Sequence, residues 1–431
     1  MRRCRDRLES FLTEMLTPLG RTERHHWGCL YVRGLLLDGE RKSIGAMLPR
    51  LLDGNQQNLQ QFVSQSPWPW QQLWQHLAIK LNRAFSATTW IIDDTGFPKQ
   101  GSHSVGVHRQ YSGTLGKKGN CQVAVSLHQA GPQGSSALGW RLYLPEVWAK
   151  DEQRRSKAGV PNEVAFHKKW ELALELIDQA GDWGLRPQVV LADAGYGDVT
   201  DFRRGLEKRH LQYAVGITSQ VRVWLEPPMI VKHQPCATGR PPLREYDYPQ
   251  QKPQSVGAVA ISHEQRFRAV TWREGSKGKM SSRFLGLRVQ TAHGYVKGEE
   301  PGKSVWLLIE WAKGEPKPAK YYLCDLPEGI SLKRLVDTAR GRWRIEQDYQ
   351  QMKEELGLDH FEGRSWVGWH HHVSLVMLAH AFLRLEQKRR GKNQRRSLPQ
   401  TRREIQRLLC IWTGKCCFCG LSAEWSSARS P

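Results

Sequence analysis

The chain has 431 residues and carries 64 Lys and Arg against 42 Asp and Glu, so its formal net charge is +22. At roughly 100–200 residues per domain, this length predicts two to four domains with a large buried core. The sequence has no uncharged apolar run near the ~20 residues of a membrane span, no apolar leader at its start, and no disulfide framework among nine mostly scattered cysteines. These features exclude a membrane protein and a small secreted scaffold, and they favour a reducing cytosol. The basic balance predicts a polyanionic partner, with nucleic acid ahead of an acidic membrane surface.

Residues 1–85 are predicted to form a helical domain. Apolar side chains recur at helical spacing in residues 8–15 and again in residues 73–81. Between these segments, the sequence is rich in glutamine at 55–61. Short helices with basic flanks are typical of a DNA-binding bundle, and a helical cap on the following domain fits the pattern equally well.

Residues 86–221 are predicted to begin an α/β domain with a mixed sheet. Runs of β-branched and aromatic residues predict strands at 89–94, 120–127 and 140–144. An amphipathic helix at 166–180 then leads through a glycine-containing break into an apolar strand at 188–193. Strands followed by helix–strand alternation indicate a sheet with mixed strand directions, flanked by helices.

Residues 222–328 interrupt the alternation of helices and strands and are predicted to be a β-rich insertion. Proline clusters and short alternating runs, such as 257–261 and 304–310, support that interpretation. Ser331 is then predicted to cap a long helical stretch through Leu356, which completes the α/β domain at 329–386 together with a last apolar helix at 373–385.

Residues 387–431 form a predicted basic tail. Between positions 384 and 415 the chain has eleven Lys and Arg against two Glu. The tail fits a solvated segment, and it also fits a stretch that neutralises DNA phosphates.

Three carboxylates lie at the predicted ends of strands, a position at which α/β enzymes often have catalytic groups. Asp93 and Asp94 end the first predicted strand, and Asp193 ends a later one. Loops converge over the ends of strands in α/β sheets, which favours functional sites there. An Asx-turn or a helix N-cap explains each aspartate equally simply. Asp93 and Asp94 would point to opposite faces of a strand, so only one of them can be a ligand, and we favour Asp93.

A fourth carboxylate lies within the long helical stretch. Arg342, Glu346 and Lys353 are spaced by four and seven residues, so they would project from one side of a helix. Taken alone, this pattern also fits a surface ladder of ion pairs, each worth only ~0.2–0.5 kcal/mol.

Several sequence blocks together resemble those of a known family. Residues 93–101 read DDTGFPKQG, 104–113 read SVGVHRQYSG, 142–148 read LYLPEVW and 191–197 read LADAGYG. With the helix that carries Arg342, Glu346 and Lys353, the region from about 30 to 385 resembles insertion-sequence DDE transposases, and specifically their Y-(2)-R-(3)-E-(6)-K subgroup. The tyrosine of that motif would fall at position 339, which is Ala339 here.

The resemblance implies a ribonuclease H-like fold and a two-metal site. Asp93 (or Asp94), Asp193 and Glu346 would be the catalytic carboxylates, holding two Mg²⁺ or Mn²⁺ ions. Arg342 and Lys353 would contact DNA phosphates.

The same resemblance implies a function and a set of partners. A transposase of this kind would bind terminal inverted repeats of double-stranded DNA, cut them and join them to target DNA. It would work as a homodimer in the bacterial cytoplasm, associated with the nucleoid through DNA. The alternatives are a domesticated or inactive DNA-binding protein, a metal-dependent endonuclease without strand transfer, and a non-enzymatic nucleic-acid-binding protein.

Overall fold

The computed structural model describes residues 2–51, 53–228, 252–275, 278–295, 302–390 and 396–413. The chain divides into two compact units, which we call unit 1 and unit 2. Unit 1 consists of Met1–Thr88, Asp93–Arg186 and Arg344–Pro431, and unit 2 consists of Thr89–Ile92 and Pro187–Trp343. Both units draw residues from the same strand, β1 (Thr89–Pro98).

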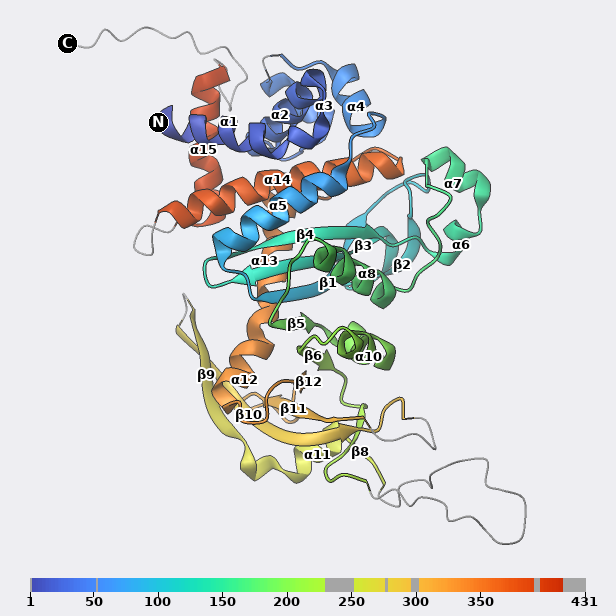
Figure 1. Ribbon diagram of the computed structural model, residues 1–431, viewed down its shortest axis with the longest axis vertical. Coiled ribbons are helices and arrows are strands. Elements are labelled where there is room, and N and C mark those ends of the chain that lie inside the picture. Colours follow the sequence, from blue (N-terminus) through green and yellow to red (C-terminus); the bar gives the residue numbers. More distant parts are fainter. Residues whose placement is uncertain are drawn as a thin grey trace, which may run out of the picture. The chain divides into compact units, whose positions relative to one another are not determined.

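The N-terminal part of unit 1 is helical, as predicted for residues 1–85 (Figure 1). Its helices are α1 (Arg2–Met15), α2 (Thr22–Leu36), α3 (Ile44–Met47), α4 (Gln56–Ser64) and α5 (Trp70–Phe85). The helices α1, α2, α4 and α5 pack against α14 (Trp366–Arg389), a long helix that is buried along most of its length, and α15 (Leu398–Thr413) packs on α14 as well. Because neighbours surround α14 on several sides, its apolar residues do not form a single stripe.

The sheet of unit 1 contains the three strands that the sequence predicts and one, β2, that it does not predict. It contains the part of β1 from Asp93 onward, β2 (His108–Ser112), β3 (Lys117–Gly131) and β4 (Gly134–Leu142). The strand β3 is central, because β2 pairs with its start, β4 pairs with its end, and β1 is its neighbour on the other side. Three helices follow: α6 (Glu146–Ala149), α7 (Glu152–Ala158) and α8 (Lys169–Asp182). The helix α13 (Trp343–Leu356) returns to this sheet later in the chain.

The sheet of unit 2 is mixed. In order, it contains the start of β1, then β5 (Val189–Ala192), β6 (Tyr213–Ile217), β12 (Lys320–Asp325), β11 (Ser304–Trp311), β10 (Gly278–Thr291), β7 (Arg222–Trp224) and β8 (Gln254–Ser255), and β9 (Arg268–Gly275) also pairs with β10. The pairs β1–β5 and β5–β6 are parallel, and the others are antiparallel. Its helices are α9 (Ala194–Gly197), α10 (Thr200–Lys208), α11 (Val256–Ser262) and α12 (Leu332–Ala339). The predicted fold class, a ribonuclease H-like mixed sheet flanked by helices, agrees with this architecture.

Two predicted elements are different in the structure. The run 257–261 is predicted to be a strand, but it lies in the helix α11, whose N-cap Ser255 accepts a hydrogen bond from the backbone N–H of Ala258. Buried residues at positions 256, 259 and 260 show helical spacing, which five alternating residues are too few to reveal. The predicted helix from Ser331 to Leu356 is divided into α12, a 3₁₀ turn at Arg340–Arg342 and α13. The division falls at Gly341, a residue type that weakens helices.

The predicted domain boundaries stay a prediction. Most described strands between residues 222 and 328 continue the sheet of unit 2, since β12 pairs directly with β6. Within the predicted basic tail, residues 398–413 form α15, where Arg402 pairs with Glu355 and lies near Asp38. Residues 391–395 and 414–431 of that tail lie outside the described residues. Among the described helices, none is both long enough and apolar enough to cross a membrane.

Three adjacent histidines are buried in the first turns of α14. His371 stacks on the indole of Trp68, with ring centroids 3.6 Å apart, and its Nδ1 lies 2.9 Å from the carbonyl oxygen of Val63. His372 Nδ1 lies 2.8 Å from the hydroxyl of Tyr31. Burial lowers the pKa of His370 and His372 to about 3 and the pKa of His371 to about 4. These side chains therefore tie α14 to the N-terminal helices in their neutral form.

We expect the stability of unit 1 to fall steeply on mild acidification. The unfolded chain takes up protons on these histidines near pH 6.5, whereas the native state resists protonation until about pH 3–4, so stability is full above pH 6.5 and is lost as the pH falls below it. From pH 7.5 to 5.5 each histidine removes about 1.4 kcal/mol from the free energy of unfolding. Urea unfolding at both pH values measures the loss. His372→Gln should reduce the pH dependence, and His103→Gln, at an exposed position, is the matched control.

Candidate active site

The prediction that Asp93 and Asp94 end the first strand is wrong, because β1 continues past them to Pro98. The two aspartates lie in the middle of this strand and have different surroundings. The carboxylate of Asp94 lies 2.5 Å from the ammonium nitrogen of Lys169, the first residue of α8. Successive side chains of a strand point to opposite faces, so Asp93 points away from α8. Asp93 is 9% exposed, and one of its carboxylate oxygens accepts a hydrogen bond from the backbone N–H of Asp94 at 2.8 Å. The structure thus gives Asp94 an ion-pair partner on the α8 face of the sheet.

The helix α13 covers the face opposite to α8. On β4, Arg141 reaches Glu175 of α8 at 3.4 Å, whereas the neighbouring ring of Trp140 lies 5.7 Å from that of Tyr349 on α13. Ser126 of β3 is paired with Trp140 and shares its face, and its hydroxyl lies 2.6 Å from the hydroxyl of Tyr349. Asp93 and α13 therefore lie on the same face of this sheet.

The position of α13 along the sheet follows from its contacts and from the strand register. Backbone hydrogen bonds from Thr88 to Ala130 and from Lys99 to Asn120 pair β1 with β3 in antiparallel register. Within one residue, this register sets Ser126 beside Asp93. Because Ser126 contacts Tyr349, the middle of α13 crosses the sheet at about the level of Asp93.

Glu346 lies at the exposed edge of the side of α13 that faces the sheet. Residues 346, 349 and 353 are three and seven positions apart and share one side of a helix. Tyr349 contacts β3, and the amine of Lys353 donates to the carbonyl oxygen of Gly96 at 2.8 Å and to the hydroxyl of Thr114 at 3.1 Å. Glu346 itself is exposed. It thus lies about one turn from the level of Asp93, on the same face, with access to solvent.

Asp193, in unit 2, follows β5 and caps the short helix α9. Its carboxylate accepts a hydrogen bond from the backbone N–H of Gly195 at 3.0 Å, which confirms the N-cap interpretation of this residue. The strands β1 and β5 pair in parallel, with Ile91 beside Leu191. Asp93 and Asp193 therefore each come two residues after the last position at which β1 and β5 pair with each other.

The two basic residues predicted to contact DNA lie in different units. Arg342 ends the 3₁₀ turn before α13 and belongs to unit 2, so the expected common helix with Glu346 begins only after it. Burial raises the pKa of Tyr322, and the guanidinium groups of Arg340 and Arg342 oppose this rise. Burial lowers the pKa of Lys353. Ala339, at the position of the motif tyrosine, is buried at the end of α12.

A buried polar cluster on α13 is not among the site residues predicted from the sequence. Asp348 is fully buried, and its carboxylate oxygens lie 3.0 Å from Nδ1 of His128 and 2.8 Å from the hydroxyl of Ser135. His380 of α14 lies 3.9 Å away, and Arg384 donates to Ser135. An acidic residue on the buried side of a helix, two positions from Glu346, was the available signal. The cluster fixes α13 to β3 and β4.

The donor chemistry of the predicted carboxylates suits a hard divalent cation. Asp93, Asp193 and Glu346 offer oxygen ligands, and a backbone N–H orients one carboxylate oxygen of each aspartate. Among the described residues, no three His, Cys, Asp or Glu side chains form a group that could hold a metal ion. The three carboxylates therefore fit such an ion by type, and their joint role as ligands stays a prediction.

Comparison with known protein families identifies the class of this chain. Residues 14–279 match the DDE superfamily endonucleases, and this match covers more than half of the sequence. The chain belongs to that superfamily, whose members generally use divalent metal ions. The matched region contains Asp93, Asp94 and Asp193 and ends before Glu346.

One curated protein is similar over a shorter region. It is described as a probable transposase for insertion sequence element IS701, from Microchaete diplosiphon. The two sequences are 30% identical over 200 residues, which cover 45% of this chain and 49% of the relative. The alignment thus spans about half the length of the curated relative.

Proposed function

We propose that this protein is a DNA transposase that binds terminal inverted repeats and catalyses metal-dependent strand cleavage and strand transfer. One observation carries the proposal: Asp93 and the sheet-facing side of α13 with Glu346 share one face of unit 1, while Asp94 is paired with Lys169 on the other. Superfamily membership and the similarity to a probable transposase support it. The active form would be a homodimer that holds two DNA ends, in the cytoplasm at the nucleoid.

The carboxylates of Asp93, Asp193 and Glu346 would hold two Mg²⁺ or Mn²⁺ ions. When bound, such ions activate the attacking oxygen and stabilise the departing one in phosphodiester chemistry. The backbone N–H groups of Asp94 and Gly195 restrict the rotation of two of the three carboxylates, which keeps their oxygens oriented. Lys353 and Arg342 would contact backbone phosphates and position the DNA end without reading its sequence.

The proposal is tested with DNA that flanks the gene. Purified full-length protein is incubated with an end-labelled duplex carrying the inverted repeat, a supercoiled target plasmid and Mg²⁺. We expect specific breaks at the repeat boundary and joined products, both abolished by EDTA. Breaks without joined products would support the endonuclease alternative, which the family description favours. Sequence-specific binding without any strand breakage would support the domesticated DNA-binding alternative and contradict the proposed catalysis.

Asp93 and Asp94 are expected to respond differently to substitution. Asp93→Asn removes a proposed ligand and should lower the cleavage rate by about 10²–10³-fold, as loss of one preorganised charge-stabilising group does. Asp94→Asn breaks the pair with Lys169, which is partly exposed, and should retain most activity. Initial cleavage rates on the same duplex measure both effects. The reverse order of activities would make Asp94 the ligand.

A further inference from the structure

The helix α4 presents an outer face made of amide side chains. Seven of the eleven residues from 55 to 65 are Asn or Gln. The buried side of the helix consists of Leu59, Phe62 and Val63. The glutamines are exposed, at positions 56, 57, 60, 61 and 65. A surface helix usually carries charged residues on its outer side, so an uncharged amide face calls for an explanation.

This helix is held rigidly in unit 1. Asn55 caps its N-terminus by accepting a hydrogen bond from the backbone N–H of Asn58 at 3.0 Å. The ring of Phe62 stacks on Trp68, and the carbonyl oxygen of Ser64 accepts from the hydroxyl of Ser365, at the start of α14. Side chains on such a fixed helix are presented to a partner at little ordering cost.

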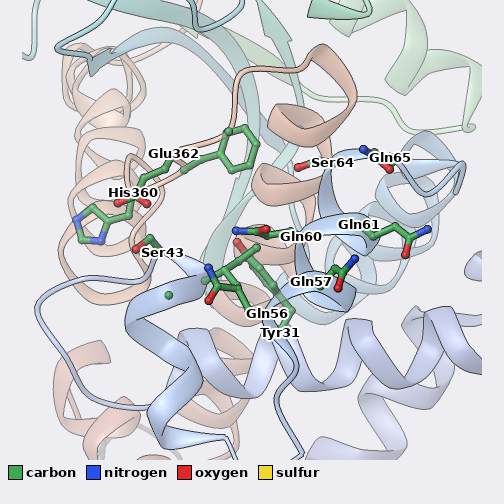
Figure 2. Close-up of a pocket in the computed structure, with 14 residues that line it drawn as sticks. Tyr31, Ser43, Gln56, Gln57, Gln60, Gln61, Ser64, Gln65, His360 and Glu362 are labelled. Carbon is green, nitrogen blue, oxygen red and sulfur yellow. The ribbon is translucent and has the colours of Figure 1, made fainter.

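Hollows lie on both flanks of α4. One, of about 620 Å³, is bounded on its other side by residues 360–363, and Figure 2 shows Gln56, Gln57 and Gln60 across from His360 and Glu362. The second, of about 310 Å³, is lined by Arg21, Glu23, Arg24 and Trp27 of the neighbouring segment. Gln61 and Gln65 line both hollows. The amide face therefore forms one wall of the first hollow and reaches the edge of the second.

The outer face of α4 carries no charged side chain of its own. No Lys or Arg occurs from residue 51 to residue 79, although the chain has 64 of them. An amide side chain offers both donors and an acceptor, and Gln can bond adenine through N6 and N7 at the same time. Arg21 and Arg24 beside the second hollow supply the cationic groups that phosphates require. The amide side chains could therefore bond base edges while the two arginines contact the phosphates of the backbone beside them.

We propose that α4 enters the major groove of the terminal repeat and reads its base edges through Gln56, Gln57, Gln60 and Gln61. This inference rests on the proposed function, because it requires a specific DNA end as the partner. The four-residue helix α3 and the 3₁₀ helix at Leu48–Arg50 precede α4, an order similar to the first helix and turn before the recognition helix in helix-turn-helix proteins. Arg21 and Arg24 contact the adjoining phosphates.

Binding in EDTA separates this inference from catalysis. Fluorescence anisotropy compares full-length protein on a duplex of the terminal repeat with its binding to a scrambled duplex of equal length. In the double variant Gln57→Ala, Gln60→Ala, we expect affinity for the repeat to fall by about 10- to 100-fold and affinity for the scrambled duplex to stay unchanged. Alanine is the best helix former, so α4 should stay folded. Gln72→Ala, an exposed glutamine on α5, is the matched control, and Arg21→Ala should weaken binding to both duplexes alike.

The possible outcomes distinguish the inference about α4 from the proposed function. If the double variant prefers the repeat as strongly as the wild type does, α4 does not read the bases and the inference is wrong, while the proposed function stands. A wild-type protein without preference for the repeat contradicts both. If the double variant changes only the oligomeric state, the amide face is an interface between copies, and the inference is again overturned.

Discussion

Replacing Glu346 with glutamine is expected to lower strand cleavage and strand transfer by about 10²–10³-fold or more. The substitution keeps the size of the side chain and one carbonyl oxygen, but it removes the negative charge that a hard divalent cation requires. Because Glu346 is exposed, its replacement should change the free energy of unfolding by less than about 0.5 kcal/mol. Initial rates of cleavage and joining on the labelled repeat duplex, at saturating Mg²⁺, measure the loss.

The helix α13 supplies a matched control for this variant. Glu354 is exposed on the same helix, with Gln350 as its hydrogen-bond partner, so Glu354→Gln makes the same chemical change away from the proposed site. It should cleave and join at nearly the wild-type rate. DNA binding in EDTA should be the same for both variants, because the repeat is bound before catalysis. Cleavage by Glu346→Gln at the wild-type rate would show that the DDE assignment is wrong for this residue.

Periodicity predicted the elements of this fold where a segment was long. The helices α1, α5 and α14 and the strands β1 and β3 follow from repeated apolar spacing, since each buries one face or nearly all of its length. Short segments were less certain. The run 257–261 alternates by type, yet Ser255 caps it as a helix, and Gly341 divides a stretch whose polar pattern is helical throughout.

The candidate site could be predicted only in part, because tertiary contacts decide its details. The sequence indicates that Asp93 and Asp94 must face opposite sides of a strand, but it does not tell which side carries α13. That information comes from two tertiary contacts. Lys169 of α8, 75 residues from Asp94 along the chain, pairs with Asp94 on one face, and Tyr349 of α13 contacts Ser126 on the other. The same limit explains Asp348, whose partners His128 and Ser135 lie on other elements. Helical spacing from Ile345 and Met352 places Asp348 on the apolar side of α13, but it does not tell which residues pair with it.

Asp348→Ala is expected to produce the largest loss of stability, about 3–5 kcal/mol in the free energy of unfolding. Burial alone would raise the pKa of Asp348, but the hydrogen bond from His128, together with His380 and Arg384, holds it below its ordinary value. Alanine would leave the hydroxyl of Ser135 and the ring of His128 without their buried acceptor. Urea unfolding at pH 7.5 measures the change, with Gln350→Ala, exposed on the same helix, as the control.

A double-mutant cycle separates the buried cluster from a general effect on packing. If Asp348 and His128 stabilise α13 through their mutual contact, the loss in Asp348→Ala, His128→Ala should be smaller than the sum of the single losses, because the second substitution removes a group that the first has already left without its partner. Glu346 lies two residues from Asp348, so the single variant should also cleave DNA more slowly than its folded fraction predicts. Additive stability losses, with cleavage proportional to the folded fraction, would show that Asp348 neither pairs with His128 nor positions the catalytic helix.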